Sequence, residues 1–219
     1  MISNVKVEKH NIDAIKEEIE SITTAFTAFQ SERNNIAFED DLLSELNTFN
    51  NQYFPTPDYR IKVSNGEIDE KAYALEKEKD FLKVFVKIVK KYNITILQNK
   101  SDTFLDKWFL DPVRKEIDFL YEHIARVKND DIRRILAIIL SRTVRSCRAT
   151  THADLGTLKE PVTATYYCKK HGKICKPLFS VMSWWQRYTG DTLDRLLRFD
   201  ALRTDTHQVC LTGDSRTVD

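Results

Sequence analysis

The chain has 219 residues, of which 42% are hydrophobic, so it can fill the core of one large domain or of two small ones. Charged residues make up 31% of the chain but nearly cancel to a net charge of +1, which excludes a global attraction to nucleic acid or membrane and leaves only local basic surfaces. Four cysteines are too few for a disulfide framework, and no apolar run approaches the roughly 20 residues that cross a bilayer, so we expect a reduced, cytoplasmic protein without a membrane partner.

The low content of glycine and proline, five of each, favours long helices with few tight turns. Apolar residues spaced alternately by four and three predict a first helix over residues 11–33, and a second, shorter helix is expected over residues 38–49. Residues 53–66 contain two prolines and end in an Asn-Gly turn, so we expect them to be irregular or briefly extended. A long helix is expected over residues 69–92. The apolar side of this helix is expected to have one main row, formed by Leu75, Leu82, Val86 and Val89. Three further residues are expected to widen this row: Phe81, Phe85 and Ile88.

Two helices with recognisable start signals follow. Asp111 is an N-cap candidate followed by Pro112 at the first helical position, and Asn129 starts the next helix. The residues expected to be buried are Val113, Ile117, Leu120, Ile124 and Val127 along the first helix, and Ile132, Ile135, Leu136, Ile139 and Leu140 along the second.

The last part of the chain is expected to hold more helix and one strand. Residues 177–189 and 191–202 are predicted to form two helices divided near Gly190, and residues 208–211 a short strand. The pattern as a whole predicts a mainly α-helical fold with a short C-terminal strand.

The densest group of chemically reactive side chains lies in residues 142–175, which hold three of the four cysteines and two of the five histidines. Cys168, His171 and Cys175 are close enough in sequence to meet at one ion. Cys147 would complete a tetrahedral zinc site, with His152 as an alternative fourth ligand. Two observations argue against a zinc site. The spacing C-x2-H-x3-C is not that of a standard zinc knuckle, and a small residue such as Cys147 is also what a buried helix end requires for packing. A structural zinc and a plain packing role for these cysteines both stay open.

The same stretch carries arginines at steps of three residues. Arg142, Arg145 and Arg148 are expected on roughly one side of a helix. Together with His152 they could grip DNA phosphates, because the guanidinium fork matches phosphate oxygens. The alternative is a solvated helix face whose arginines pair with acidic side chains.

A Gly-Asp pair follows the expected strand near the end of the chain. Glycine lets the chain turn sharply as it leaves a strand, and an acid at that point faces the crevice where open α/β sheets bind ligands. The same pair is also common in ordinary turns. The sequence contains no Gly-rich phosphate loop, no Ser/His/Asp set and no paired catalytic carboxylates, so no residue is assigned a catalytic role.

Several of these segments together resemble a known family. RSCRATTHADLGTLKEP, YYCKKHGKICKP, RYT, LRTD and LTGDSR are similar to segments of bacterial and archaeal DNA methylases, which use S-adenosylmethionine to methylate adenine N6 or cytosine N4. The resemblance is specific over residues 141–215 and looser before them. In that family a Gly-Asp after a strand shortly precedes the catalytic (D/N/S)PPY loop. The resemblance therefore implies that Gly213 and Asp214 lie near the cofactor or the target base.

The resemblance implies the helical insertion region of an α/β, Rossmann-like methyltransferase of a restriction-modification system, with DNA as its partner. Residues 1–140 would form a helical bundle, residues 141–176 a Cys/His-containing loop region, and residues 177–219 two helices that lead into the first strand of the catalytic half. The sequence contains neither the Gly-rich cofactor motif nor a PPY loop. We therefore expect an internal fragment that does not methylate DNA by itself, and no protein partner is inferred.

Two other functions are compatible with the residues. One is a non-enzymatic helical module that binds DNA or a protein partner and contains a small Cys/His knuckle, with or without zinc. The other is a helical scaffold without a nucleic acid partner, which would be favoured if the arginines are paired internally.

Overall fold

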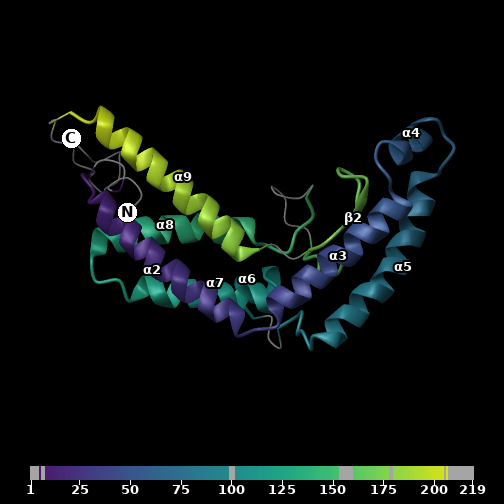
Figure 1. The fold of residues 1–219 in the computed structure, drawn as a ribbon, viewed down its shortest axis with the longest axis horizontal. Coiled ribbons are helices and arrows are strands. Elements are labelled where there is room, and N and C mark those ends of the chain that lie inside the picture. The colour runs from purple at the N-terminus through teal and green to yellow at the C-terminus, as the bar shows by residue number, and fades with distance from the viewer. Residues whose placement is uncertain are drawn as a thin grey trace. The chain divides into compact units, whose positions relative to one another are not determined.

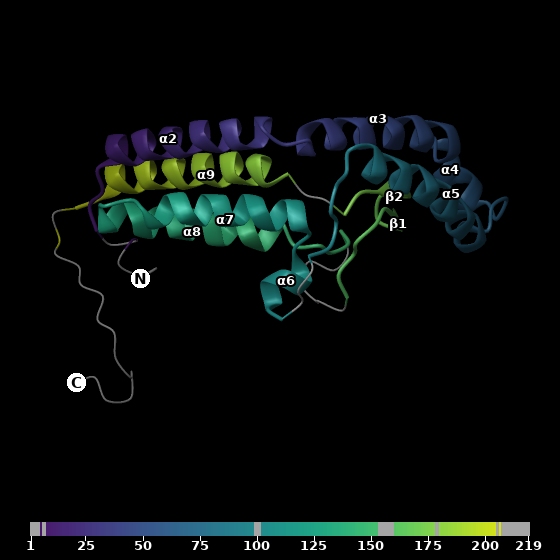
Figure 2. The same cartoon turned by 90° about the horizontal axis from the view of Figure 1, so that it is seen from below.

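The computed structural model describes residues 5, 8–98, 102–152, 160–177, 180–204 and 206. These residues are mostly helical and include one two-stranded antiparallel sheet (Figures 1 and 2), which confirms the expectation of a mainly α-helical chain. The helices are α2 (Ile12–Ser31), α3 (Asn35–Tyr53), α4 (Asp58–Ser64), α5 (Glu70–Lys91), α6 (Phe104–Trp108), α7 (Asp111–Ala125), α8 (Asp130–Ser146) and α9 (Val181–Leu202), and the strands are β1 (Tyr166–Cys168) and β2 (Lys173–Cys175). The Rossmann-like surroundings stay a prediction.

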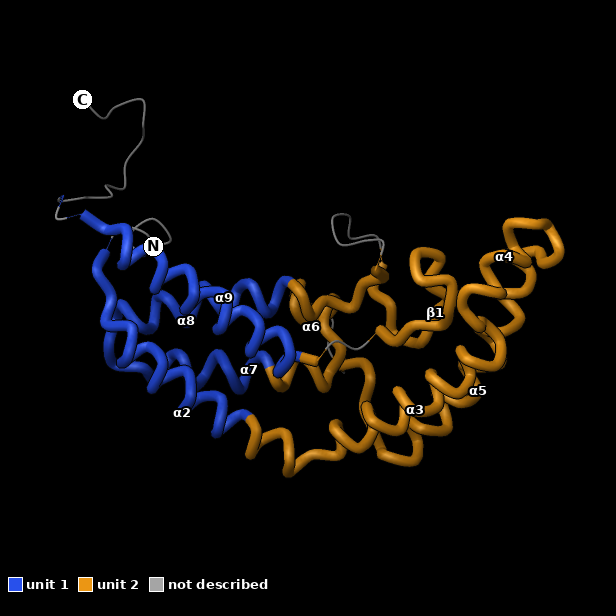
Figure 3. Tube along the Cα trace, turned by 45° about the horizontal axis from the view of Figure 1, so that its top comes forward, with its two compact units in different colours: residues 1–26, 117–145, 181–219 blue, residues 27–116, 146–180 orange. Residues whose placement is uncertain are grey.

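The chain divides into two compact units, coloured separately in Figure 3. Unit 1 comprises Met1–Phe26, Ile117–Arg145 and Val181–Asp219, and unit 2 comprises Thr27–Glu116 and Ser146–Ser180. Each unit is assembled from stretches that are far apart in the sequence. The division predicted from the sequence cuts the chain into consecutive segments, with boundaries at residues 140 and 176. Those segments were predicted as functional parts and not as compact units, so this division stays a prediction.

Unit 1 is a set of helices that run alongside one another, from α2, α7, α8 and α9 (Figures 1 and 2). Phe26 stacks on Phe119 with a centroid separation of 5.8 Å. Trp185 is fully buried, and its indole N–H donates a hydrogen bond of 2.9 Å to the hydroxyl of Thr23. This bond satisfies the polar group of a side chain whose large ring fills the core. Other buried residues of this unit are Ile15, Ile19, Ile22, Leu120, Ile124, Ile135, Leu136, Ile139 and Val181.

Unit 2 pairs α3 with α5 and packs the β1–β2 hairpin against both helices. An aromatic cluster forms the contact between the two helices, where Phe49 meets Phe81 edge-on at 5.0 Å. The buried apolar residues of α3, α4 and α5, with the residue after α3, are Phe38, Leu42, Leu46, Phe54, Tyr59, Ala74, Phe81, Phe85 and Ile88. Phe54 of this set also contacts Tyr167 of the hairpin, with ring centroids 5.5 Å apart.

The predicted start of α8 is confirmed, and α7 begins one residue earlier than an N-cap at Asp111 predicts. The side chain of Asn129 accepts hydrogen bonds from the backbone N–H groups of Asp131 and Ile132, at 3.0 and 3.1 Å, and so caps α8. Asp111 is the first residue of α7. The ten apolar residues that the sequence places on the inner faces of these helices are all buried. These starts depend on local chemistry, which is why they are readable from the sequence.

The expectation for residues 53–66 was wrong, because α4 lies within them. The backbone N–H groups of Tyr59 and Ile61 donate to the carbonyl oxygens of Pro55 and Pro57, at 2.8 and 3.2 Å. Both prolines thus lie ahead of the helix, where their missing N–H groups cost no intrahelical hydrogen bond. The prolines start this helix instead of preventing it.

The apolar row expected along α5 was also wrong in part. Leu75, Leu82 and Val86 are exposed, with 55%, 39% and 42% of their surface accessible, whereas the residues expected only to widen the row are buried. The reason is that Phe81 packs against Phe49 of α3, and both apolar rows fit the same helical period. The spacing alone could not distinguish them.

A further correction concerns Gly190, which does not divide two helices but lies inside α9. A glycine in a helix interior costs about 1 kcal/mol relative to alanine, an amount that packing of the surrounding helix can offset. Asp191, the next residue, pairs with Arg195 one turn later in α9 and with Arg142 of α8. The segment is one helix of 22 residues.

The hairpin β1–β2 was not anticipated, and the strand expected over residues 208–211 lies outside the described residues. In the part of the chain that the structure describes, none of the helices combines the length and apolar character that a membrane span requires.

Candidate functional site

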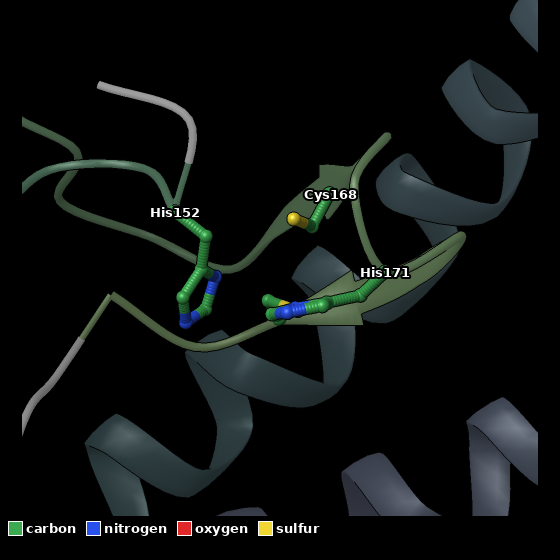
Figure 4. Close-up of side chains that lie close together, drawn as sticks. His152, Cys168 and His171 are labelled. Carbon is green, nitrogen blue, oxygen red and sulfur yellow. The ribbon is translucent and has the colours of Figure 1, made fainter. Parts of the chain in front are cut away.

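Four potential metal ligands meet in unit 2. The ligand atoms of His152, Cys168, His171 and Cys175 all lie within 4.8 Å of one another. Figure 4 shows the side chains of Cys168 and His171 pointing toward His152. Two of these residues lie on the hairpin strands, one in the turn between the strands, and His152 comes from the segment after α8. The fold thus brings together residues that are up to 23 positions apart (175 minus 152).

His152 is held by Tyr166 of β1. The hydroxyl of Tyr166 accepts the backbone N–H of His152 at 3.0 Å and lies 2.8 Å from the Nδ1 atom of its ring. The rings of His152 and His171 meet edge-on, with centroids 4.5 Å apart. Burial lowers the pKa of His152, and the nearby His171 and Lys170 lower it further. The imidazole of His152 is therefore biased toward its neutral form, the form that binds metal ions.

The backbone ahead of His152 is also fixed. The N–H of Ala149 donates to the carbonyl of Trp108 at 2.8 Å, and the carbonyl of Ala149 accepts from the N–H of Val162 at 2.8 Å. Both Ala149 and Trp108 are buried. These contacts anchor the segment that leads from α8 to the cluster.

The two thiols of the cluster are buried, and Cys175 lies close to His171. The Nδ1 atom of His171 is 3.4 Å from the Sγ atom of Cys175. Burial raises the pKa of Cys175 to about 12, and the neighbouring Cys168 raises it further while Lys173 opposes the rise. A thiol in this setting stays protonated at neutral pH unless a cation replaces its proton.

The turn between the strands is fixed by Arg60 of α4. Its Nη2 atom donates to the carbonyl oxygens of Lys169 and Lys170, at 3.0 Å each. Gly172 has a φ angle of +65°, and a Cβ atom at this position would lie 2.4 Å from the Nε atom of Arg60. Only glycine therefore fits this turn without displacing the arginine.

The outer edges of the hairpin are paired with side chains from α3 and α5. Asn50 accepts the N–H of Ile174 and donates to its carbonyl oxygen, at 2.9 Å each. On the other strand, Glu78 accepts the N–H of Tyr167 at 2.9 Å. Tyr167 and Ile174 face each other in the ladder, so the two side chains satisfy both edges of the hairpin at the same level. The cluster is thus attached to the helical framework of unit 2.

Cys147 lies elsewhere in unit 2. It is buried just after α8, and it is not a member of the four-residue group. Burial raises its pKa, with further contributions from Glu116 and Glu39. Of the ligand set expected from the sequence, the structure brings together Cys168, His171 and Cys175, and the alternative ligand His152 completes the group. Metal binding itself stays a prediction.

Arg142 has an internal set of contacts in unit 1. Its guanidinium bonds the carboxylate of Asp191 at 2.5 Å and the hydroxyl of Thr192 at 3.1 Å, and it lies 4.3 Å from the ring centroid of Tyr188. The bond from Arg142 holds the pKa of Asp191 below its usual value, as does the bond from Arg195. Arg142 thus joins α8 to α9.

The other predicted contact residues are placed as follows. Arg145 is exposed on α8 and Arg148 is half-buried after it. Gly213 and Asp214, for which the resemblance implies contact with the cofactor or the base, lie outside the described residues.

Sequence reasoning missed the supporting roles of Tyr166, Arg60 and Asn50. For Asn50 no local signal exists, since it is one of several polar residues in a helix.

The chain was compared with known proteins. No family model matches it, and no solved structure matches it. It is 35% identical over 223 aligned residues to the Type II methyltransferase M.MjaII of Methanocaldococcus jannaschii, and the alignment covers 100% of this chain. This chain is a relative of a Type II methyltransferase. The methylase resemblance drawn from the sequence motifs is thereby confirmed. The chain spans 42% of the length of this methyltransferase relative.

Proposed function

We propose that the chain is the helical part of a DNA methyltransferase that modifies an exocyclic amine, adenine N6 or cytosine N4, within a restriction-modification system. The observation that carries the proposal is the 35% identity to a Type II methyltransferase along the whole of this chain. S-adenosylmethionine would supply the methyl group. By the family resemblance, Gly213 and Asp214 would lie next to this cofactor or to the target base, although neither is among the described residues.

The chemistry indicates what this part of the enzyme has to do. An exocyclic amine is a poor nucleophile because its lone pair is delocalised into the ring, and the target base must leave the helix to be reached. The PPY loop, which accepts the hydrogens of the amine in the resembling family, does not occur in this sequence. The helical part would therefore hold the DNA and shape the cleft around the flipped base, and we propose that it does not transfer methyl groups alone.

The proposed DNA contacts are Arg142, Arg145, Arg148 and His152. Arg145 is exposed on α8, so it is the residue chosen for the test. In an assembled enzyme, Arg145→Gln is expected to weaken DNA binding and to reduce the slope of log affinity against log salt by about 1, the value for one phosphate contact. The control is Arg198→Gln on α9, an exposed arginine that pairs with Asp194. An unchanged slope for Arg145→Gln would refute its phosphate contact.

A chimera tests the enzymatic proposal. This chain would replace the matching span of the M. jannaschii methyltransferase, and transfer of radioactive methyl groups from S-adenosylmethionine to DNA would be measured. We expect transfer by the chimera and none by the 219-residue chain alone. The control is the same enzyme with that span deleted. A chimera that folds and binds S-adenosylmethionine but transfers no more methyl groups than the deletion control would contradict the proposal.

The second candidate is a non-enzymatic helical module that binds DNA or a protein partner. The gathered Cys/His group favours it, because such clusters commonly stabilise small binding modules. It predicts that the chain alone binds DNA with the same affinity whether or not S-adenosylmethionine is present, and that the chimera is inactive.

A further inference from the structure

We propose that His152, Cys168, His171 and Cys175 bind one zinc ion in a closed, structural site. This inference is independent of the methyltransferase proposal. Two thiolates and two imidazoles are a common zinc ligand set, and Zn–S and Zn–N bonds of about 2.3 and 2.0 Å place tetrahedral ligand atoms roughly 3.3–3.8 Å apart. The 3.4 Å between the Nδ1 atom of His171 and the Sγ atom of Cys175 already lies in that range. The largest separation in the group, 4.8 Å, needs to shorten by only about 1 Å.

One ring nitrogen of His152 has a hydrogen-bond partner in Tyr166. Its Nδ1 atom is 2.8 Å from the hydroxyl of Tyr166. When Nδ1 carries the proton and donates it to this oxygen, Nε2 keeps its lone pair for the ion. Metal-binding histidines usually donate their other ring N–H to a fixed acceptor, which sets both the tautomer and the ring orientation. Tyr166 is fixed in turn, because it belongs to β1 and also accepts the backbone N–H of His152.

The other three ligands are presented by a hairpin that is held from outside. Arg60 bonds two carbonyl oxygens of the turn that carries His171, and Asn50 bonds the strand residue next to Cys175. The ligands therefore do not have to be ordered when the ion binds. An ion here would join the segment after α8 to the hairpin, within unit 2.

The donor set also predicts the type of site. Four protein ligands leave no open coordination position, which is typical of structural and not of catalytic zinc. Binding converts each thiol to a thiolate, so one Zn²⁺ releases two protons, and the resulting complex with two neutral imidazoles has no net charge. Such a neutral complex suits thiols that are buried, whereas two unpaired thiolates at this spacing would repel each other.

Metal titration of the purified 219-residue chain tests the proposal. After reduction and removal of metal, Co²⁺ is added under anaerobic conditions. We expect one equivalent to bind, with the intense visible absorption of tetrahedral Co²⁺ and a thiolate-to-cobalt charge-transfer band, and one equivalent of Zn²⁺ to remove both signals. The absence of stoichiometric binding overturns the proposal. So does an octahedral Co²⁺ spectrum, or a disulfide between Cys168 and Cys175 that forms in place of metal binding.

Two matched variants identify the fourth ligand. His152→Ala is expected to weaken Co²⁺ binding at least 100-fold, whereas Cys147→Ala, at the buried cysteine outside the group, is expected to leave the charge-transfer band unchanged. The opposite result would overturn the ligand set. Tyr166→Phe removes only the acceptor for His152 and is expected to weaken binding about 10–100-fold without changing the tetrahedral spectrum. Circular dichroism of each variant shows whether it folds. If a variant does not fold, the titration of the unsubstituted chain still tests the proposal.

Discussion

Glu116 is a carboxylic acid buried in unit 2, and it makes the stability of the chain depend on pH. Only 7% of its surface is accessible, and the side-chain amide of Gln30 donates to its Oε1 atom at 3.1 Å. Burial raises its pKa from an ordinary value of 4.5 to about 7, with Glu39 adding to the rise and Gln30 opposing it. Protonation of this one group is therefore linked to folding.

The sign and size of the effect follow from this pKa. Between pH 4.5 and 7 the folded state keeps a proton on Glu116 that the unfolded state has lost, so the free energy of unfolding falls as the pH rises through this window. Above pH 7 the folded chain carries a buried charge at full cost. Since one pKa unit corresponds to about 1.4 kcal/mol, the total loss is about 3 kcal/mol.

The substitution Glu116→Gln tests the reasoning, because glutamine has the same shape, stays neutral and can still accept from Gln30. Urea unfolding followed by circular dichroism from pH 4.5 to pH 8.5 is expected to show a variant that equals the original chain at the acid end. At the alkaline end the variant is expected to be more stable by about 3 kcal/mol. Glu122→Gln, at an exposed acid on α7, is the control and should keep the original pH dependence. Parallel curves for the original chain and Glu116→Gln would refute the buried-charge argument.

Two further substitutions probe how the hairpin is attached to the helices. Asn50→Ala is expected to reduce the free energy of unfolding by about 2–3 kcal/mol, because it leaves the N–H and carbonyl of Ile174 buried without partners; a loss below 0.5 kcal/mol in urea unfolding would mean that water replaces both bonds. Gly172→Ala is expected to lower the melting temperature more than Gly66→Ala does. Both glycines have positive φ angles, but only Gly172 faces Arg60, while the position of a Cβ at Gly66 is open, so equal effects would rule out the steric contact.

Much of the helical structure could be predicted from the sequence. Capping residues such as Asn129, and apolar residues at helical spacing along α7 and α8, act within a few residues of one another. Where the prediction was wrong, two arrangements satisfied the same local pattern. The phenylalanines and the leucines of α5 both occur at helical spacing, so either set could form the buried face. Packing of Phe81 against Phe49 of α3 decides between them.

The candidate site also depends partly on local sequence and partly on tertiary contacts. By itself the sequence determined the types of ligand, since Cys168, His171 and Cys175 lie close together along the chain, and it determined the relation to methyltransferases through short motifs. Only the tertiary structure placed His152 among them and left Cys147 outside the group. The physical reason is that the position of His152 depends on hydrogen bonds between segments far apart in sequence, from Tyr166 and from the backbone around Ala149. No spacing within the chain encodes such contacts.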